Sequence, residues 1–158
     1  MTGLDIFLFK CICKPDYVYI VGGASTGPPS AHHLHVQCFD PTAAEETNVV
    51  INTCGVLNRA YHSVIEISGD ALLIGGELSD GTPATDVVRC SINDEGFYSK
   101  VSSQNGVSRK GMVGCSVGPA GNEIGVLFGG CNGDEYFDDI ILVKQGGEDQ
   151  GETGTCGC

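Results

Sequence analysis

The sequence predicts an all-β protein built from about three repeated sheet units. Two observations carry this prediction. A short apolar segment followed by two glycines occurs three times, as VYIVGG at 18–23, LLIGG at 72–76 and VLFGG at 126–130. The chain also holds 24 glycines and 41% hydrophobic residues, and almost no window lacks Gly, Pro or a β-branched residue. Long helices are therefore disfavoured, whereas short strands joined by turns are favoured.

The elements of each unit keep their order around the glycine pair. Gly23, Gly76 and Gly130, the second glycines, are separated by 53 and 54 residues. A polar loop follows each pair, at 24–33, 77–86 and 131–139, and a further apolar strand follows each loop, at 34–39, 87–92 and 140–143. An opening strand precedes the glycine strand, at 5–13, 58–67 and 108–117, and the last two have an arginine as their second residue, Arg59 and Arg109.

The residue types fit these positions physically. A strand that reads as a continuous apolar run is expected to be covered on both faces. Two glycines at its end permit positive φ and close approach of another backbone. In the strand at 87–92, Val88, Cys90 and Ile92 share one face, and Arg89 faces away.

This order of features resembles the kelch family of β-propellers. The resemblance rests on Gly22, Gly23, Gly75, Gly76, Gly129, Gly130, Arg59, Arg109, His62, Asp86 and Asp139. The second unit matches best and ends with the aromatic pair Phe97–Tyr98. The third unit has Met112 in place of the histidine, the first has no arginine, and the chain has no Trp.

What the resemblance implies is a partial kelch β-propeller, an open arc of about three blades of antiparallel strands. We place the blades at 4–54, 57–103 and 107–145, within a domain at 4–145. A disordered acidic, Gly-rich tail is expected at 146–158. Propellers typically close with four to eight blades, so three would leave apolar blade faces open at both ends. A fragment of a larger propeller is favoured; the alternatives are self-association through the open blade edges to complete a ring, and an arc that stands alone at low stability.

The charge and the cysteine content limit which partners and which cellular compartment we expect. The net charge is −12, which argues against a nucleic-acid or anionic-membrane surface. No apolar window is long enough to span a membrane, and the N-terminal apolar run lacks the positive residues of a signal peptide. Nine scattered cysteines are better explained as small core residues of a cytoplasmic protein than as a disulfide framework.

No residue set predicts a catalytic, cofactor or metal site. His33 and His35 would share a strand face, and His32 precedes them, but no further ligand is placed beside them by sequence. The pairs Cys11/Cys13 and Cys156/Cys158 lack the usual two-residue zinc spacing. The glycine-rich segment at 22–30 lacks the lysine of a phosphate-binding loop.

The resemblance therefore implies a protein-interaction module, a scaffold or adaptor, rather than an enzyme. The candidate contact residues lie in the loops after the glycine pairs: Ser25, Pro28, Glu77, Asp80, Asn132, Asp134 and Glu135. We expect Arg59 and Arg109 to bond backbone carbonyls between blades, although a place on the binding face is the alternative. The competing functions are a metal enzyme fragment, similar to galactose oxidase with copper or to plant specifier proteins with iron, and a truncated product without independent function.

Overall fold

The computed structural model describes residues 6–7, 10–14, 16–25, 36–43, 45–47, 51–53, 59–78, 80–93, 96–103 and 107–144. At 6–7, 24–25, 36–37, 45–47, 51–53, 92–93 and 96–103 only the backbone is described. Strands and turns make up this part of the chain, which contains no helix, so the all-β prediction is confirmed. In these ranges there is accordingly no helix of the length and apolar character needed to cross a membrane.

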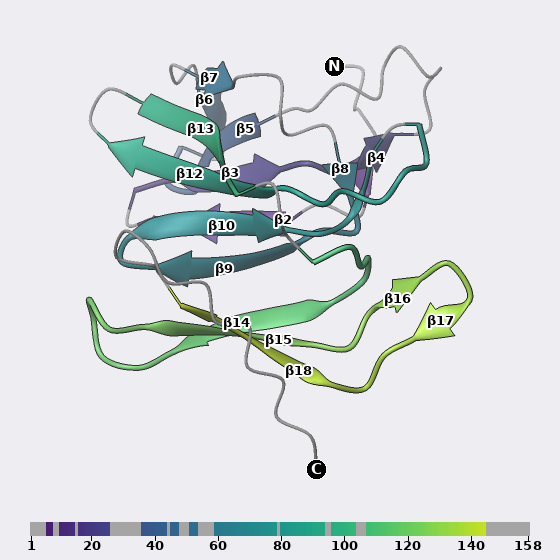
Figure 1. Ribbon diagram of the computed structural model, residues 1–158. Helices are drawn as coiled ribbons and strands as arrows, with labels where there is room; N and C mark the ends of the chain where they lie inside the picture. The colour runs from purple at the N-terminus through teal and green to yellow at the C-terminus, as the bar shows by residue number, and fades with distance from the viewer. Residues whose placement is uncertain are drawn as a thin grey trace.

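Three main sheets follow one another along the chain (Figure 1). The first sheet has the order β2 (Lys10–Cys13), β3 (Val18–Val21), β5 (Val36–Asp40), β6 (Glu45–Thr47). The second sheet has the order β9 (Ser63–Ile67), β10 (Asp70–Ile74), β12 (Val87–Asn93), β13 (Gly96–Ser103), with β7 (Ile51–Thr53) beyond β13. The third sheet has the order β14 (Val113–Val117), β15 (Ile124–Phe128), β18 (Ile140–Lys144). In each sheet, the strand that precedes a glycine pair is the second strand.

Small strand pairs lie beyond the glycine pairs. They are β1 (Ile6–Phe7) with β4 (Ala24–Ser25), β8 (Arg59–Ala60) with β11 (Glu77–Leu78), and β16 (Cys131–Asn132) with β17 (Glu135–Tyr136). In Figure 1 the labelled members of these pairs, β4, β8, β16 and β17, lie on the right, and the turns that join β9 to β10 and β14 to β15 lie on the left. The small strand pairs that follow the glycine pairs therefore lie at one end of the three sheets, which we call the loop end.

The opening strands are broken where continuous strands were expected. In the second unit the chain leaves β8, passes through Tyr61 at φ 57°, and starts β9 at Ser63. In the third unit Lys110 forms an isolated bridge and Gly111 has φ 73° before β14 begins. A positive φ turns the chain out of the strand direction, so each opening segment serves two different sheets.

One pairing differs from the expected antiparallel arrangement. Strand β7 pairs in parallel with β13, through Phe97↔Ile51, Tyr98↔Asn52 and Ser99↔Thr53. The expected boundary at residue 54 assigns this segment to the first unit, but it extends the second sheet. The open edge of β13 offers unpaired backbone groups, which an additional strand satisfies.

Two apolar cores join the sheets face to face. Ile12, Tyr19, Val21 and Cys38 of the first sheet pack on one face of the second, where the buried residues are Ala71, Leu73, Val88 and Cys90. The opposite face of the second sheet packs on the third, through Ile65, Ile67, Ile74, Met112 and Leu127. As predicted, Val88 and Cys90 are buried and Arg89 faces away, bonded to Asp70.

The expectation of two covered faces holds only for the second sheet. In β10, Leu73 and Ile74 are both buried although they lie on opposite faces. In β15, Leu127 is buried but Phe128 is 53% exposed, so the prediction is wrong for the third unit. Among the described residues, the third sheet has a packed neighbour on one side only.

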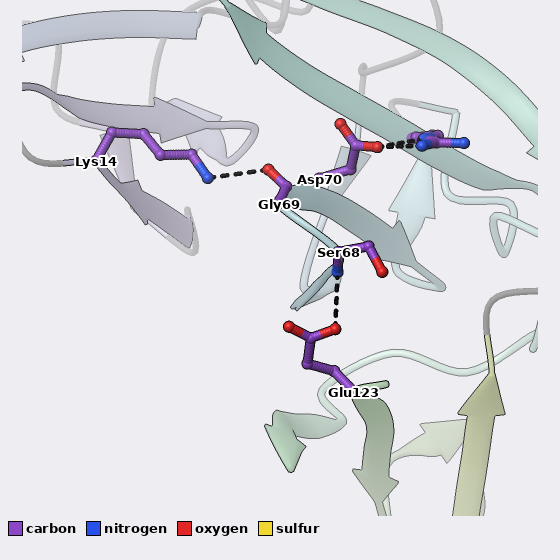
Figure 2. Close-up of polar contacts among 6 residues, drawn as sticks. Lys14, Ser68, Gly69, Asp70 and Glu123 are labelled. Carbon is purple, nitrogen blue, oxygen red and sulfur yellow. Dashed lines mark hydrogen bonds and ion pairs between the residues drawn. The ribbon is translucent and has the colours of Figure 1, made fainter. Parts of the chain in front are cut away.

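The turn of the second sheet is held from both sides. Figure 2 shows Lys14 of the first sheet donating from Nζ to the Gly69 carbonyl at 3.0 Å. From the third sheet, a carboxylate oxygen of Glu123 accepts the Ser68 N–H at 3.2 Å. The turn end of the molecule is thus tied across all three sheets by two polar contacts.

Candidate functional site

The three glycine pairs have equivalent backbone conformations. The first glycines, Gly22, Gly75 and Gly129, have φ of 66°, 66° and 70°. The second glycines, Gly23, Gly76 and Gly130, have φ of 115°, 94° and 89°. All six angles lie in the region that favours glycine, so each pair turns the chain in the same way.

Each of the first two pairs docks on the opening segment of the following sheet. The Gly23 N–H donates to the Arg59 carbonyl at 3.1 Å, and the Gly76 N–H donates to the Arg109 carbonyl at 2.8 Å. A Cβ at Gly75 would overlap that carbonyl and would lie 2.8 Å from Met112 Cε. A Cβ at Gly129 would meet only the Phe137 carbonyl oxygen, at 3.2 Å. The close approach expected from the sequence is therefore present between sheets.

Arg59 is bonded to two backbone carbonyls and to the Asp86 carboxylate inside the second unit, and we call this arrangement a clamp. Its guanidinium donates from Nη1 to the Gly75 and Asp86 carbonyls, each at 3.2 Å, and from Nη2 to Asp86 Oδ1 at 2.7 Å. The side chain is fully buried, so the planar fork replaces water for three acceptors at once. The carbonyls belong to its own unit rather than to a neighbouring one.

Arg109 forms the corresponding clamp in the third unit. It bonds both carboxylate oxygens of Asp139, with Nη2 to Oδ2 at 3.0 Å, and its Cζ lies 3.6 Å from the centre of the Phe137 ring. The bonds from Arg109 hold the pKa of the Asp139 carboxyl below its usual value. The two clamps fix where the loops at 77–86 and 131–139 return to their sheets.

His62 and Met112 occupy equivalent buried positions. Each packs against two glycines: His62 against Gly22 and Gly76, and Met112 against Gly75 and Gly130. Burial, followed by the nearby charge of Arg59, lowers the pKa of His62 from 6.5 to about 4. The imidazole is therefore neutral at neutral pH and acts as a packing residue.

The second and third units are joined at the loop end of the sheets. Lys110 forms an ion pair with Glu77, and its Nζ lies 5.6 Å from the centre of the Tyr61 ring. The Gly111 N–H donates to the Tyr61 carbonyl at 2.9 Å. The hydrogen bond that Lys110 donates to the Glu77 carboxylate raises the pKa of Lys110. We call the surface formed by Tyr61, Glu77, Lys110, Glu135 and Tyr136 the rim.

The predicted contact residues have different surroundings. Asp80 Oδ1 accepts the Thr82 N–H at 2.9 Å and its hydroxyl at 2.6 Å, which lowers the pKa of Asp80 and braces its loop. Glu77 is half-buried in its ion pair. The β16–β17 hairpin carries exposed Asn132, Asp134 and Glu135. Ser25 lies in β4 with only its backbone described, and Pro28 lies outside the described residues.

Three rim residues were missed by the sequence reasoning. Tyr136 is 83% exposed on β17, Tyr61 is 41% exposed, and Lys110 pairs across the sheets. Tyr136 stood within the predicted loop at 131–139 as an aromatic residue among acidic ones, a signal that could have identified it. Lys110 follows the repeat arginine directly, but no local pattern connects it to Glu77.

The histidines and cysteines that the sequence offers as ligand candidates are described only in part. The described ranges contain no cluster of three His, Cys, Asp or Glu residues suited to a metal ion. The described cysteines are free thiols, and burial raises the pKa of Cys11. His32, His33, His35, Cys156 and Cys158 lie outside the described residues. Compared with known proteins, the chain matches no protein-family model and no curated relative.

Proposed function

We propose that the chain is an arc of three kelch-type propeller blades that binds a protein partner through the rim. The observation that carries this proposal is the repetition of one exit structure. Three glycine pairs share their φ angles, and two of the units share an arginine–aspartate clamp behind the loops. Loops that are held this firmly at their bases are suited to presenting side chains to another macromolecule.

The rim forms one surface because its parts are bonded to each other. The backbone of Lys110 exchanges two hydrogen bonds with Cys131, both at 2.9 Å, and Cys131 pairs with Tyr136. The Lys110–Glu77 ion pair then joins this hairpin to the second unit. A partner would therefore contact loops from two units at fixed relative positions.

The side chains indicate the chemistry of the partner. Tyrosine is enriched in binding hot spots because it buries a large ring and keeps a polar end. Tyr136 is 83% exposed, and exposed acidic residues stand beside it at Asp134, Glu135 and Asp138. The net charge of −12 also attracts a basic partner, over a longer range than these side chains do. A protein with a basic surface and a pocket for an aromatic ring fits these features.

Affinity capture with paired variants tests the proposal. Tyr136→Ala and Glu135→Lys alter the rim, whereas Asp16→Lys makes the same charge change in the exposed turn between β2 and β3. We expect both rim variants to reduce the affinity for a captured and then purified partner about tenfold or more, and Asp16→Lys to leave it unchanged. Equal capture by all three variants would contradict the proposal.

Two further measurements address the competing functions. Elemental analysis of the purified chain is expected to find no copper or iron in stoichiometric amount, and finding either would favour a metal enzyme. Circular dichroism during urea denaturation is expected to show a cooperative, β-rich species. A chain without cooperative unfolding would favour the non-functional truncation.

A further inference from the structure

The two internal sheet contacts use the same pair of faces. We call the face of a sheet that packs on the following sheet its leading face, and the opposite face its trailing face. In the first sheet the leading face carries Ile12 and Tyr19, and in the second it carries Ile65, Ile67 and Ile74. The trailing faces that receive them carry Leu73 in the second sheet and Leu127 in the third. Both contacts are thus head to tail.

The leading face of the third sheet has no neighbour in the described structure. The strand register places its residues in three rows: Val113–Phe128–Ile140, Cys115–Val126–Leu142 and Val117–Ile124–Lys144. Eight of these nine residues are apolar or cysteine, and the ninth is Lys144. Exposures are 68% for Val113, 53% for Phe128, 51% for Val117, 49% for Ile140 and 46% for Leu142. Apolar residues gathered so closely on one face normally mark an interaction surface.

Comparison of the second and third sheets indicates which kind of surface would cover the leading face of the third sheet. Counted from the glycine pair, Phe128 stands where Ile74 stands in the second sheet, and Val117 stands where Ile67 stands. Ile74 and Ile67 are 1% and 2% exposed, because the trailing face of the third sheet covers them. The positions left open in the third sheet are therefore those that a trailing face covers one unit earlier.

At the other end of the arc, the trailing face of the first sheet has no packed neighbour among the described residues. In the first sheet it carries Cys11 and Cys13 on β2 and Val18 and Ile20 on β3, since these alternate with the buried residues of the leading face. Phe39 on β5 is 37% exposed. The face has small and apolar side chains at the positions where the other trailing faces have Val64 and Ala71, or Gly114 and Gly125.

We propose that two copies of the chain associate head to tail, the third sheet of each packing on the first sheet of the other. This proposal rests on the propeller interpretation under which two arcs of three sheets close into a ring of six. Six units lie within the range at which propellers close. The contact is heterologous, and such contacts end growth only when the ring closes. Both open faces are covered in this arrangement.

The C-terminal segment is a poor alternative occupant. Residues 145–158 read QGGEDQGETGTCGC and contain no Val, Leu, Ile, Met or aromatic residue. Such a segment has almost no apolar surface to bury against Phe128 or Leu142. A second copy, by contrast, brings a sheet face of the type that already packs on this position twice within the chain.

The contact between the second and third sheets also predicts which residues would meet across the contact between two copies. Ile65 lies over both Gly114 and Gly125, with Cγ2 at 2.8 Å from the position of a Cβ at Gly114 and Cδ1 at 2.2 Å from that of a Cβ at Gly125. The equivalent of Ile65 in the third sheet is Cys115, and the equivalent of Gly114 in the first sheet is Cys11. In the ring, Cys115 would therefore face the partner's Cys11.

The test combines the mass of the full chain, measured in reductant, with site-specific cross-linking after the reductant has been removed. Sedimentation is expected to give twice the 16.4 kDa of the chain. A short bismaleimide, in which each thiol adds across one maleimide double bond, should link Cys115 to the partner's Cys11, as identified by peptide mapping. Cys115→Ser should abolish this link, and Cys131→Ser, altered at the rim end, should retain it.

A pair of variants tests the face itself. Phe128→Glu is expected to give a monomer, while Pro119→Glu, which adds the same charge in the exposed β14–β15 turn, should remain dimeric. Circular dichroism on both variants confirms that they are folded. A monomeric wild-type chain, a Cys115–Cys115 link between copies, or an open filament would each overturn the proposed ring. Capture through the rim by a monomeric Phe128→Glu chain would show that the protein-binding function stands separately.

Discussion

Alanine substitutions at Gly75 and Gly129 should separate the energetic cost of backbone strain from the cost of a clash between sheets. Gly75 and Gly129 have nearly the same φ, 66° and 70°, so Gly75→Ala and Gly129→Ala place a Cβ in the same left-handed conformation. This costs about 1–2 kcal/mol for a residue other than glycine. It is partly offset because alanine restricts the unfolded chain, by about 0.4–1 kcal/mol. Gly129→Ala should therefore lower the free energy of unfolding by about 1 kcal/mol.

Gly75→Ala has an additional cost because a neighbouring sheet lies in contact. The new Cβ would overlap the Arg109 carbonyl and would lie 2.8 Å from Met112 Cε, which is closer than real Cβ contacts. The Arg109 segment must move, which weakens the bond from the Gly76 N–H, now 2.8 Å long. The lost hydrogen bond accounts for about 1 kcal/mol and the overpacking for about 1–3 kcal/mol. Gly75→Ala should thus be destabilising by about 3–5 kcal/mol in total.

Urea denaturation followed by circular dichroism measures both values in the Phe128→Glu background, where no partner sheet adjoins Gly129, with an excluded osmolyte present for all proteins if Gly75→Ala is marginal. The reasoning is refuted if the two alanine variants have the same free energy of unfolding. That result would mean that the Gly75 pair does not dock on the third sheet in solution.

Three further substitutions probe the clamps and the interior. Arg59→Lys should lower the free energy of unfolding by about 3 kcal/mol, because an ammonium cannot reach both carbonyls and the Asp86 carboxylate. A loss below about 1 kcal/mol in urea denaturation would argue against the clamp. Glu77→Gln should cost no more than about 1 kcal/mol, and the difference from wild type should shrink in high salt, because the Lys110 pair is partly exposed. Ser63→Ala should leave the urea midpoint unchanged or raise it, because the buried Ser63 hydroxyl has no hydrogen-bond partner among the described residues.

The sequence predicted those features that a short segment encodes by itself. A glycine pair at the end of an apolar run demands a particular backbone conformation, and all three pairs adopt it. Alternation placed Val88 and Cys90 on the buried face and Arg89 on the other, as observed. Strand positions followed closely because apolar runs and turn residues alternate along the whole chain.

Features that depend on distant partners were not predicted. The parallel pairing of β7 with β13 joins residues that are far apart, and β7 has no pattern that distinguishes a parallel edge strand. The break at Tyr61 was missed because tyrosine rarely adopts positive φ. The equivalent residue in the third unit is Gly111, and aligning the two units would have exposed the turn.

The candidate site was predicted by region rather than by residue. The loop at 131–139 does carry exposed acidic side chains, but Glu77 is engaged by Lys110 and Asp80 braces its own loop. Sequence marks a loop as polar without indicating whether a carboxylate is bonded to its neighbours or free to meet a partner. That distinction arises only when the units are packed together.

The His62–Met112 equivalence gives a prediction for acid stability. The folded pKa of His62, about 4, lies below its ordinary value of 6.5, so folding favours the neutral ring. This stabilisation is complete above pH 6.5 and is lost as the pH falls from 6.5 to about 4, at about 1.4 kcal/mol per pH unit. The wild-type chain should therefore lose about 2 kcal/mol of unfolding free energy between pH 7.5 and pH 5, before carboxylates with lowered pKa, such as Asp139, begin to titrate. His62→Met, which copies the residue that packs against the same glycines in the third unit, should lose less than half of that amount in urea denaturation at the two pH values. A variant with an undiminished loss would show that the acid sensitivity comes from another group, since a methionine at this position carries no proton to titrate.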